Sequence, residues 1–206
     1  MSKRLLLTLT ALLAVTACGV SSQTSNDTSP SPASTPSAAA SPSPPTLASL
    51  DPCKLVTAQE ASQLSGTTYD AGVEQTADNG ARECIYSRQS LSVFVVMVNV
   101  ATDAATAEAD WATTEADAQS GLQQLAGSEG ASVGLQAGNI TLPGANEAAT
   151  AAASGAIGGN HTLNISAIYV LKGAVFFMFS DLVLDKSAAS ASAMATLAAT
   201  TLTRIP

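Results

Sequence analysis

The chain has 206 residues, of which 46% are hydrophobic, and its formal net charge is −8 at pH 7. This length leaves room for about one domain once a leader and a linker are set aside. The acidic balance argues against a nucleic-acid partner and against direct attraction of the surface to anionic lipid head groups.

The first 17 residues have the pattern of an export signal. Two basic residues, Lys3 and Arg4, precede a short apolar stretch, and small residues lead to Cys18. A basic start, an apolar core and small residues at the cleavage point are typical of secretory signals. Because a cysteine stands where cleavage would fall, the segment resembles a bacterial lipoprotein signal. We therefore expect residues 1–17 to be a lipoprotein signal peptide and Cys18 to carry a diacylglyceryl group.

The apolar stretch of the signal is too short for a stable transmembrane helix, and no later stretch reaches the required length. One acyl chain holds a protein on a membrane only weakly, whereas two or more hold it firmly. Lipoprotein modification supplies at least two. We therefore expect the membrane to be a partner through the lipid anchor, and the protein to lie at the outer face of the cytoplasmic membrane, in the cell envelope.

Residues 18–49 differ in composition from the rest of the chain. Serine, threonine, proline and alanine dominate, as in Ser29-Pro30-Ser31-Pro32. Such a sequence has too few large apolar side chains to form a packed core. We expect a disordered tether, about 30 Å long on average, that joins the lipid to a single globular domain at residues 50–206.

Two helix starts open this domain. In Asp51-Pro52-Cys53, an aspartate suited to capping precedes a proline suited to the first helical turn. Thr57 is followed three residues later by Glu60, which is the capping-box pattern. Gly66 then predicts a helix end. We expect a short helical turn followed by a helix.

Two further cysteines, Cys53 and Cys84, lie in the part of the chain that such a signal would export. An even pair in an oxidising compartment usually forms a disulfide, and a closed loop of about 32 residues is worth roughly 3.7 kcal/mol in the chain-entropy model. Two free thiols are the alternative. A metal site is disfavoured, because His161 is the only histidine and no Cys-x-x-Cys motif occurs. No cofactor is expected.

The middle of the chain predicts a hairpin and a helix. Residues 84–87 and the β-branched run 91–98 are strand-like, and the second run has so little alternation that it predicts a central strand covered on both faces. Residues 104–125 have helical spacing. The Gly- and Ala-rich stretch 131–154 predicts mainly a loop, with one short strand around Ala151.

The last third predicts a second hairpin and a final helix. Strands at 163–171 and 174–182 flank Lys172-Gly173, where glycine supplies the positive φ of a tight turn. The last helix begins at Asp185, and its inner stripe is Met194, Leu197, Ala198, Thr201, Leu202 and Ile205. This order of elements predicts an α+β domain, in which a mostly antiparallel sheet of four to six strands packs against helices.

Three motifs resemble those of a known family. The run Asp51-Pro52-Cys53-Lys54-Leu55-Val56-Thr57 is similar to its Asp-Pro-Cys-x-Leu-Leu-Thr. Cys84-Ile85-Tyr86 is similar to its Cys-x-Tyr, and Pro143-Gly144-Ala145-Asn146-Glu147-Ala148 to its Gly-Leu-Gly-Asp-Glu-Ala. With the signal and the Ser/Pro linker, these motifs resemble the actinobacterial lipoproteins of the domain of unknown function 3558 family.

This resemblance implies that Cys53 and Cys84 are paired, that the fold is α+β and similar to the Mog1/PsbP-like fold, and that the protein lies in the cell envelope. It implies no activity, because the family is uncharacterised. Ala145-Asn146 stands where the family has Gly-Asp, so no role of that carboxylate is carried over.

Few residues suggest chemistry. His161 has neither a second histidine nor a Gly-x-Ser-x-Gly motif beside it, so we expect it in a surface turn. Carboxylates spaced along a helix lack the arrangement of a calcium loop, so we expect a solvated helix face. Those carboxylates are Asp103, Glu108, Asp110, Glu115 and Asp117. We expect the larger aromatic side chains in the core, and they are Phe94, Trp111, Tyr169, Phe176, Phe177 and Phe179.

These observations predict a membrane-anchored extracytoplasmic lipoprotein that is not an enzyme. Its domain is expected to bind an unknown ligand or protein of the envelope, through residues that the sequence does not identify. One alternative is a secreted envelope hydrolase, for which His161 and Glu147 are the side chains to test, and another is a purely structural or spacer protein.

Overall fold

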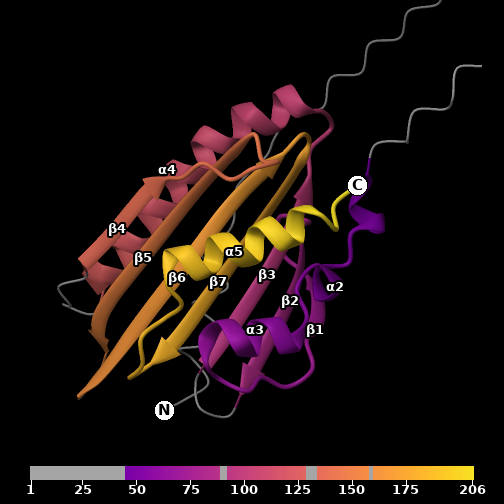
Figure 1. Ribbon diagram of the computed structural model, residues 1–206. Helices are drawn as coiled ribbons and strands as arrows, with labels where there is room; N and C mark the ends of the chain where they lie inside the picture. Colours follow the sequence, from indigo (N-terminus) through magenta and orange to yellow (C-terminus); the bar gives the residue numbers. More distant parts are fainter. Residues whose placement is uncertain (1–44, 89–91, 129–133, 158–159) are drawn as a thin grey trace, which may run out of the picture.

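The computed structural model describes residues 45–88, 92–128, 134–157 and 160–206. Within them, seven antiparallel strands form one sheet, with helices on both faces (Figure 1). In spatial order the strands are β1 (Val73–Thr76), β2 (Arg82–Arg88), β3 (Ser92–Val100), β7 (Val175–Leu184), β6 (His161–Lys172), β5 (Glu147–Ile157) and β4 (Gly134–Asn139). The predicted α+β class is confirmed, and the sheet has more strands than expected.

The helices divide between the two faces of the sheet (Figure 1). On one face, called the α5 face below, lie η2 (Leu47–Ser49), α2 (Pro52–Leu55), α3 (Ala58–Ser65) and α5 (Ala191–Leu202). On the other, the α4 face, lies α4 (Ala104–Ser128). None of the helices in the described ranges has the length and hydrophobicity that a membrane crossing requires.

The main core lies between the sheet and the α5 face helices. Phe94, Phe177 and Phe179 are fully buried there, and ring centroids lie 5.3 Å apart for Phe177–Phe179 and 6.3 Å for Phe94–Phe179. Burying each such ring contributes about 1.5–3 kcal/mol. The predicted inner stripe of the last helix is confirmed as buried: Met194, Leu197, Ala198, Thr201, Leu202 and Ile205.

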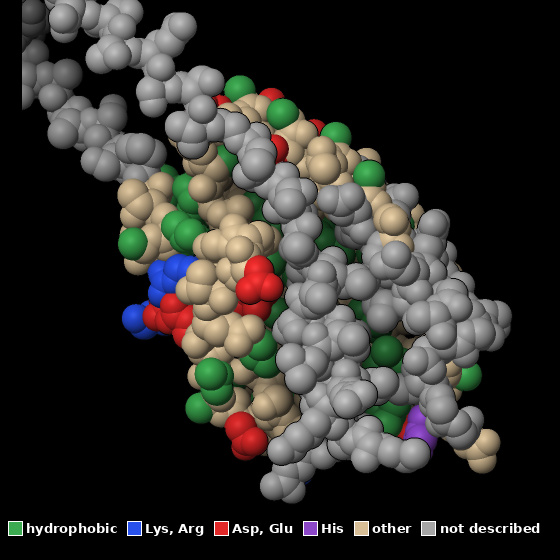
Figure 2. All heavy atoms as spheres, turned by 180° about the vertical axis from the view of Figure 1, so that it is seen from behind, with side chains coloured by type: hydrophobic (Ala, Val, Ile, Leu, Met, Phe, Trp, Pro, Cys, Tyr) green, Lys and Arg blue, Asp and Glu red, His purple; other side chains and the backbone are tan. Residues whose placement is uncertain are grey.

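The α4 face is less completely covered. Trp111 of α4 packs edge-on against Phe176, which also contacts Tyr169. On β3, Val96 and Val98 of the α5 face are fully buried, whereas the α4-face side chains Val93 and Val95 are only half-buried. Hydrophobic side chains remain visible at this face in the view from behind (Figure 2). Met97, which is also on the α4 face, is buried. The prediction that this strand is covered on both faces is therefore confirmed for the α5 face and in part for the α4 face.

The predicted helix caps are confirmed. The Asp51 side chain accepts a hydrogen bond from the Cys53 N–H at 3.0 Å and begins α2. Thr57 and Glu60 cap one another reciprocally at the start of α3. Gly66 ends α3 with φ 62°, a conformation that costs glycine little.

The prediction that 131–154 is mainly a loop is wrong, although the strand expected around Ala151 is present as part of β5. The strands β4 and β5 occupy most of this stretch, and β5 alone has 11 residues. Alanine and glycine have low strand propensity, but packing overrides propensity in sheets. Ala149, Ala151 and Ala153 are buried on the α4 face, and Ala149 lies in one apolar cluster with Trp111.

The β6–β7 turn lies one residue later than predicted. Lys172 and Val175 are a cross-strand pair, so the two turn residues are Gly173 and Ala174. Gly173 has the positive φ that the sequence suggested, at 57°.

The prediction that the last helix begins at Asp185 is also wrong. The helix begins at Ala191, because Ser190 caps it by accepting a hydrogen bond from the Ala193 N–H at 3.2 Å. Asp185 instead has φ 56°, and its backbone N–H donates to the Thr162 carbonyl at 2.8 Å. It is therefore part of a turn that closes the end of the sheet.

Candidate functional site

The predicted disulfide is present. Cys53 of α2 and Cys84 of β2 are bonded, with their Cα atoms 5.1 Å apart. The chain passes so close to this bond that a Cβ on Gly72 would lie 2.4 Å from Cys84 Sγ and 2.5 Å from Tyr86 Cε1. Glycine is therefore needed at position 72, which sequence reasoning did not identify.

The first described residues are tied to the same strand. Arg82 Nη1 donates hydrogen bonds to the carbonyl oxygens of Leu47 (3.0 Å), Ala48 (3.2 Å) and Leu50 (2.6 Å). The guanidinium also pairs with Glu74 of β1. The chain thus enters the domain at the β1–β2 edge of the sheet. Cys18 and residues 1–44 lie outside the described residues, so lipidation and the tether stay predictions.

The loop between β4 and β5 holds the family motif in a defined conformation. Pro143 and Gly144 are the central residues of a β-turn, in which the Ala145 N–H donates to the Leu142 carbonyl at 3.1 Å. Gly144 has φ 87°, as a type II turn requires of its third residue. Sequence alone could have found this turn from the Pro-Gly pair.

Asn146 fastens this loop to the neighbouring hairpin. Its backbone N–H donates to the Leu171 carbonyl at 2.7 Å, and its Oδ1 accepts from the Gly173 N–H at 2.6 Å. An aspartate would offer the same acceptor oxygen at this position. The difference from the family motif, asparagine for aspartate, therefore leaves this fastening unchanged.

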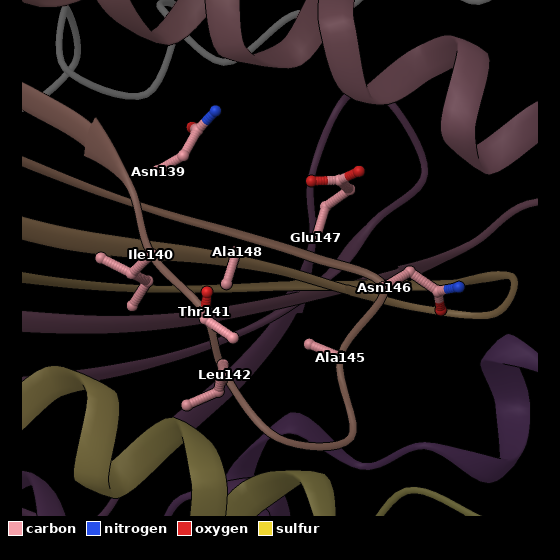
Figure 3. Close-up of a pocket in the computed structure, with 8 residues that line it drawn as sticks. All are labelled: Asn139, Ile140, Thr141, Leu142, Ala145, Asn146, Glu147 and Ala148. Atoms are coloured by element: carbon pink, nitrogen blue, oxygen red, sulfur yellow. The ribbon is translucent and has the colours of Figure 1, made fainter.

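A pocket of about 280 Å³ lies at this loop (Figure 3). It is lined by Asn139, Ile140, Thr141, Leu142, Ala145, Asn146, Glu147 and Ala148. The side chains of Asn139 and Glu147 point together toward α4, whereas that of Leu142 points the other way (Figure 3). Register explains this: Asn139 pairs with Ala149, which shares a face with Glu147.

Three polar side chains of the pocket are uncommitted. Asn139, Thr141 and Glu147 are all exposed or half-buried, and within the described residues their side chains form no hydrogen bond or ion pair. Asn146, by contrast, is committed to the loop. The pocket therefore combines a fixed frame with an amide, a hydroxyl and a carboxylate that remain available to a ligand. Of these, the sequence analysis named only Glu147 as a side chain to test for activity.

His161, which the sequence predicted in a surface turn, is exposed but is the first residue of β6, at the opposite end of β5 from the pocket. Its Nδ1 is 2.6 Å from Asp185 Oδ2, and both side chains are largely exposed. Asp185 Oδ1 also accepts from the Thr162 N–H, and these bonds hold the pKa of the Asp185 carboxyl below its usual value. His161 pairs with Ile157 at one end of β5, whereas Glu147 begins that strand. Ten residues along a strand span about 33 Å, so His161 and Glu147 cannot act on one substrate.

The structure contains a buried polar cluster that the sequence analysis did not predict. Asp181 of β7 is fully buried on the α5 face, where it accepts hydrogen bonds from the Tyr69 hydroxyl (3.2 Å) and the Ala189 N–H (2.9 Å). Burial raises the pKa of the Asp181 carboxyl, against the effect of these two bonds. Thr67, two residues before Tyr69 in the sequence, is also buried, and its hydroxyl has no hydrogen-bond partner in the described part of the protein. The signal in the sequence is one charged residue inside an apolar strand.

The remaining predicted residues have structural surroundings. Asp103 caps α4 by accepting a hydrogen bond from the Thr106 N–H at 2.8 Å, and this bond lowers the pKa of Asp103. Glu108 and Asp110 are exposed, as expected, and the side chains of residues 115 and 117 are not among those that the structure describes. The aromatic residues lie in the two cores, with Phe176 and Phe177 on opposite faces as alternation requires.

No group of three His, Cys, Asp or Glu side chains suited to a metal ion occurs within the described ranges. The fold and the site define an α+β domain that is cross-linked by one disulfide and has a small polar pocket at one edge of its sheet. The chain belongs to the family described as Protein of unknown function (DUF3558), whose model matches residues 13–157. No curated protein and no solved structure matches the chain significantly, so the likeness to the Mog1/PsbP-like fold stays a prediction.

Proposed function

We propose that this protein is a lipid-anchored domain of the cell envelope that binds a ligand or partner outside the cytosol. Cys18 would carry the lipid, and the residues between it and the Leu47–Ser49 turn would separate the domain from the membrane. The observation that carries the proposal is the Cys53–Cys84 disulfide. Disulfides persist in oxidising compartments and are rare in the cytosol, so the bond supports the export that the N-terminal sequence predicts.

The place where the chain enters the fold supports an anchored role. The disulfide begins only a few residues after the Leu47–Ser49 turn, and Arg82 binds the carbonyls around that turn. A pull on the tether would therefore reach β2 through a covalent bond and several hydrogen bonds. The pocket at β4–β5 lies at the opposite edge of the sheet, away from this attachment.

Binding is favoured over catalysis by the separation of the titratable side chains. Glu147 is the only carboxylate among the described side chains that line the pocket, and His161 lies about 33 Å along β5 from it. General acid–base chemistry needs its groups within hydrogen-bond reach of one substrate. A tethered binding domain, in turn, gains effective concentration near other envelope components.

Membrane fractionation tests the anchored part of this proposal. In a bacterium that processes lipoproteins, we expect the chain in the membrane fraction and labelled by a fatty-acid precursor, and the Cys18→Ala chain unlabelled. Equal labelling of the wild-type and Cys18→Ala chains would contradict the anchor.

An activity screen against esters, peptides and glycosides tests the binding role. Turnover that is lost in Glu147→Ala or His161→Ala would favour the hydrolase alternative.

A further inference from the structure

The β4–β5 pocket has a charge that restricts its ligand. Among the described residues that line the pocket, Glu147 is the only charged one, and none is a Lys or Arg. Within the described residues Glu147 takes part in no ion pair. A carboxylate with no counter-ion favours a positively charged group, and an ammonium or guanidinium bound to it makes the stronger, charge-assisted hydrogen bonds.

The neighbouring polar groups add a second requirement. Asn139 lies diagonally across the β4–β5 ladder from Glu147 on the same face, which places their Cβ atoms about 7 Å apart. Thr141 follows two residues after Asn139 and lines the same pocket. An amide and a hydroxyl both donate and accept, so together they suit a ligand with hydroxyl groups a few bonds from its charge.

The size of the pocket limits the ligand further. Its volume of about 280 Å³ lies just below the range of roughly 300–1,000 Å³ that holds drug-sized molecules. A single sugar ring fits this volume, and a longer oligomer would extend out of it. The frame is already fixed by the Pro143–Gly144 turn and the Asn146–Gly173 hydrogen bond, so binding requires little ordering of the backbone.

We propose that this pocket binds the ammonium group of a small hydroxylated amine, of the size of an amino sugar, with Glu147 as the counter-ion and with Asn139 and Thr141 as partners for the hydroxyls. The proposal deepens the binding role proposed above and rests on it.

Three related sugars test this proposal. Glucosamine carries the ammonium group, glucose of nearly equal size has a hydroxyl in its place, and in the larger N-acetylglucosamine the nitrogen is a neutral amide. Saturation-transfer NMR titrations with the full chain in detergent should give a millimolar dissociation constant for glucosamine, as is usual for so small a ligand. Glucose and N-acetylglucosamine should bind at least about tenfold more weakly, because each lacks the charge-assisted bond.

Two variants of equal charge change locate the effect. Glu147→Gln should weaken glucosamine binding about tenfold, to the level of glucose, whereas Asp70→Asn, an exposed position next to β2, should leave it unchanged. Equal affinity for the three sugars, an unchanged affinity in Glu147→Gln, or no binding of glucosamine by the folded chain would each overturn the proposal. These titrations do not depend on the lipid, so the anchor stands or falls separately in the Cys18→Ala fractionation.

Discussion

The two edges of the sheet differ in how their polar groups are used. At the β1–β2 edge, the cysteines are joined in a disulfide, and Arg82 is bonded to three backbone carbonyls and to Glu74. The chain also passes within contact of Cys84 at Gly72. At the β4–β5 edge, the loop backbone is equally well fixed, but three side chains in its pocket have no partner among the described residues.

This difference separates stability from binding. Groups that are already bonded within the protein contribute to the fold and are unavailable to a ligand, whereas an exposed polar side chain without a partner contributes little to stability. We therefore expect substitutions at the β1–β2 edge to change the free energy of unfolding, and substitutions of the uncommitted pocket side chains to change binding only.

Removal of the disulfide should have the largest effect. The double variant Cys53→Ala/Cys84→Ala should lose about 3–4 kcal/mol of unfolding free energy, since the bond closes a loop with a sequence separation of 31. Urea titration of the variant and of the reduced and oxidised wild type measures the loss. A change below about 1 kcal/mol would mean that the hydrogen bonds around β2 suffice without the bond.

A pair of glycine substitutions compares the two edges directly. Gly72→Ala should cost about 1–3 kcal/mol, because the new Cβ would overlap Cys84 Sγ and the Tyr86 ring. Gly138→Ala in β4 should be neutral or slightly stabilising, because no atom of the described side chains or backbone lies within 4 Å of its Cβ position. Thermal unfolding of both chains gives the comparison. Equal melting temperatures would contradict the tight packing at the β1–β2 edge.

The Glu60–Arg204 ion pair should contribute a smaller, pH-dependent amount. The hydrogen-bonded Arg204 guanidinium lowers the pKa of Glu60 from 4.5 to about 2. A carboxyl whose pKa is lowered by folding adds stability above its unfolded pKa and loses it as the pH falls to the folded pKa. Glu60→Gln should therefore cost about 1–2 kcal/mol at pH 7, discounted for partial exposure, and almost nothing near pH 2.

Urea titrations at pH 7, 5 and 3 test this dependence. Glutamine still completes the capping box with Thr57, so the variant isolates the charge. A difference from wild type that stays constant over this range would show that the ion pair is not its source.

Asn146 should have a smaller effect at the opposite edge. Asn146→Ala removes the hydrogen bond to the Gly173 N–H and should cost about 1 kcal/mol. Asn146→Asp keeps the acceptor and should cost clearly less. If both variants lose the same stability, the side-chain oxygen is not what fastens the loop to the β6–β7 turn.

The uncommitted side chains should have the smallest effect on stability. Glu147→Gln and Asn139→Ala should each stay within about 0.5 kcal/mol of wild type in urea titrations, as is usual for surface positions away from packed or bonded groups. A larger loss in either variant would show that the side chain has a partner in the fold and is not free to bind a ligand.

Much of the fold could be predicted from local signals. Asp51, Thr57 with Glu60, and Gly66 each mark a helix end through bonds or φ values that depend on neighbouring residues only. The strand β5 could not be predicted in the same way, because its alanines become strand residues through pairing with β6 and packing under α4. The prediction that the last helix begins at Asp185 was wrong for a similar reason, since Asp185 bonds to Thr162, which is remote in sequence.

The candidate site shows the same limit. The Pro143–Gly144 turn is local and can be predicted from its own residues. The pocket instead depends on Asn139 and Glu147 lying diagonally across the β4–β5 ladder on one face. The burial of Asp181 with Tyr69 joins residues 112 positions apart. Contacts between residues that are remote in sequence are therefore the part of the site that sequence patterns cannot predict.

The most direct test of the account is the intact mass of the chain extracted from membranes without reducing agent. We expect a polypeptide that starts at Cys18, carries a diacylglyceryl group there, and has the mass of a Cys53–Cys84 disulfide. Recovery from the soluble fraction of a chain that retains residues 1–17, has no lipid and has free thiols at both positions would contradict it.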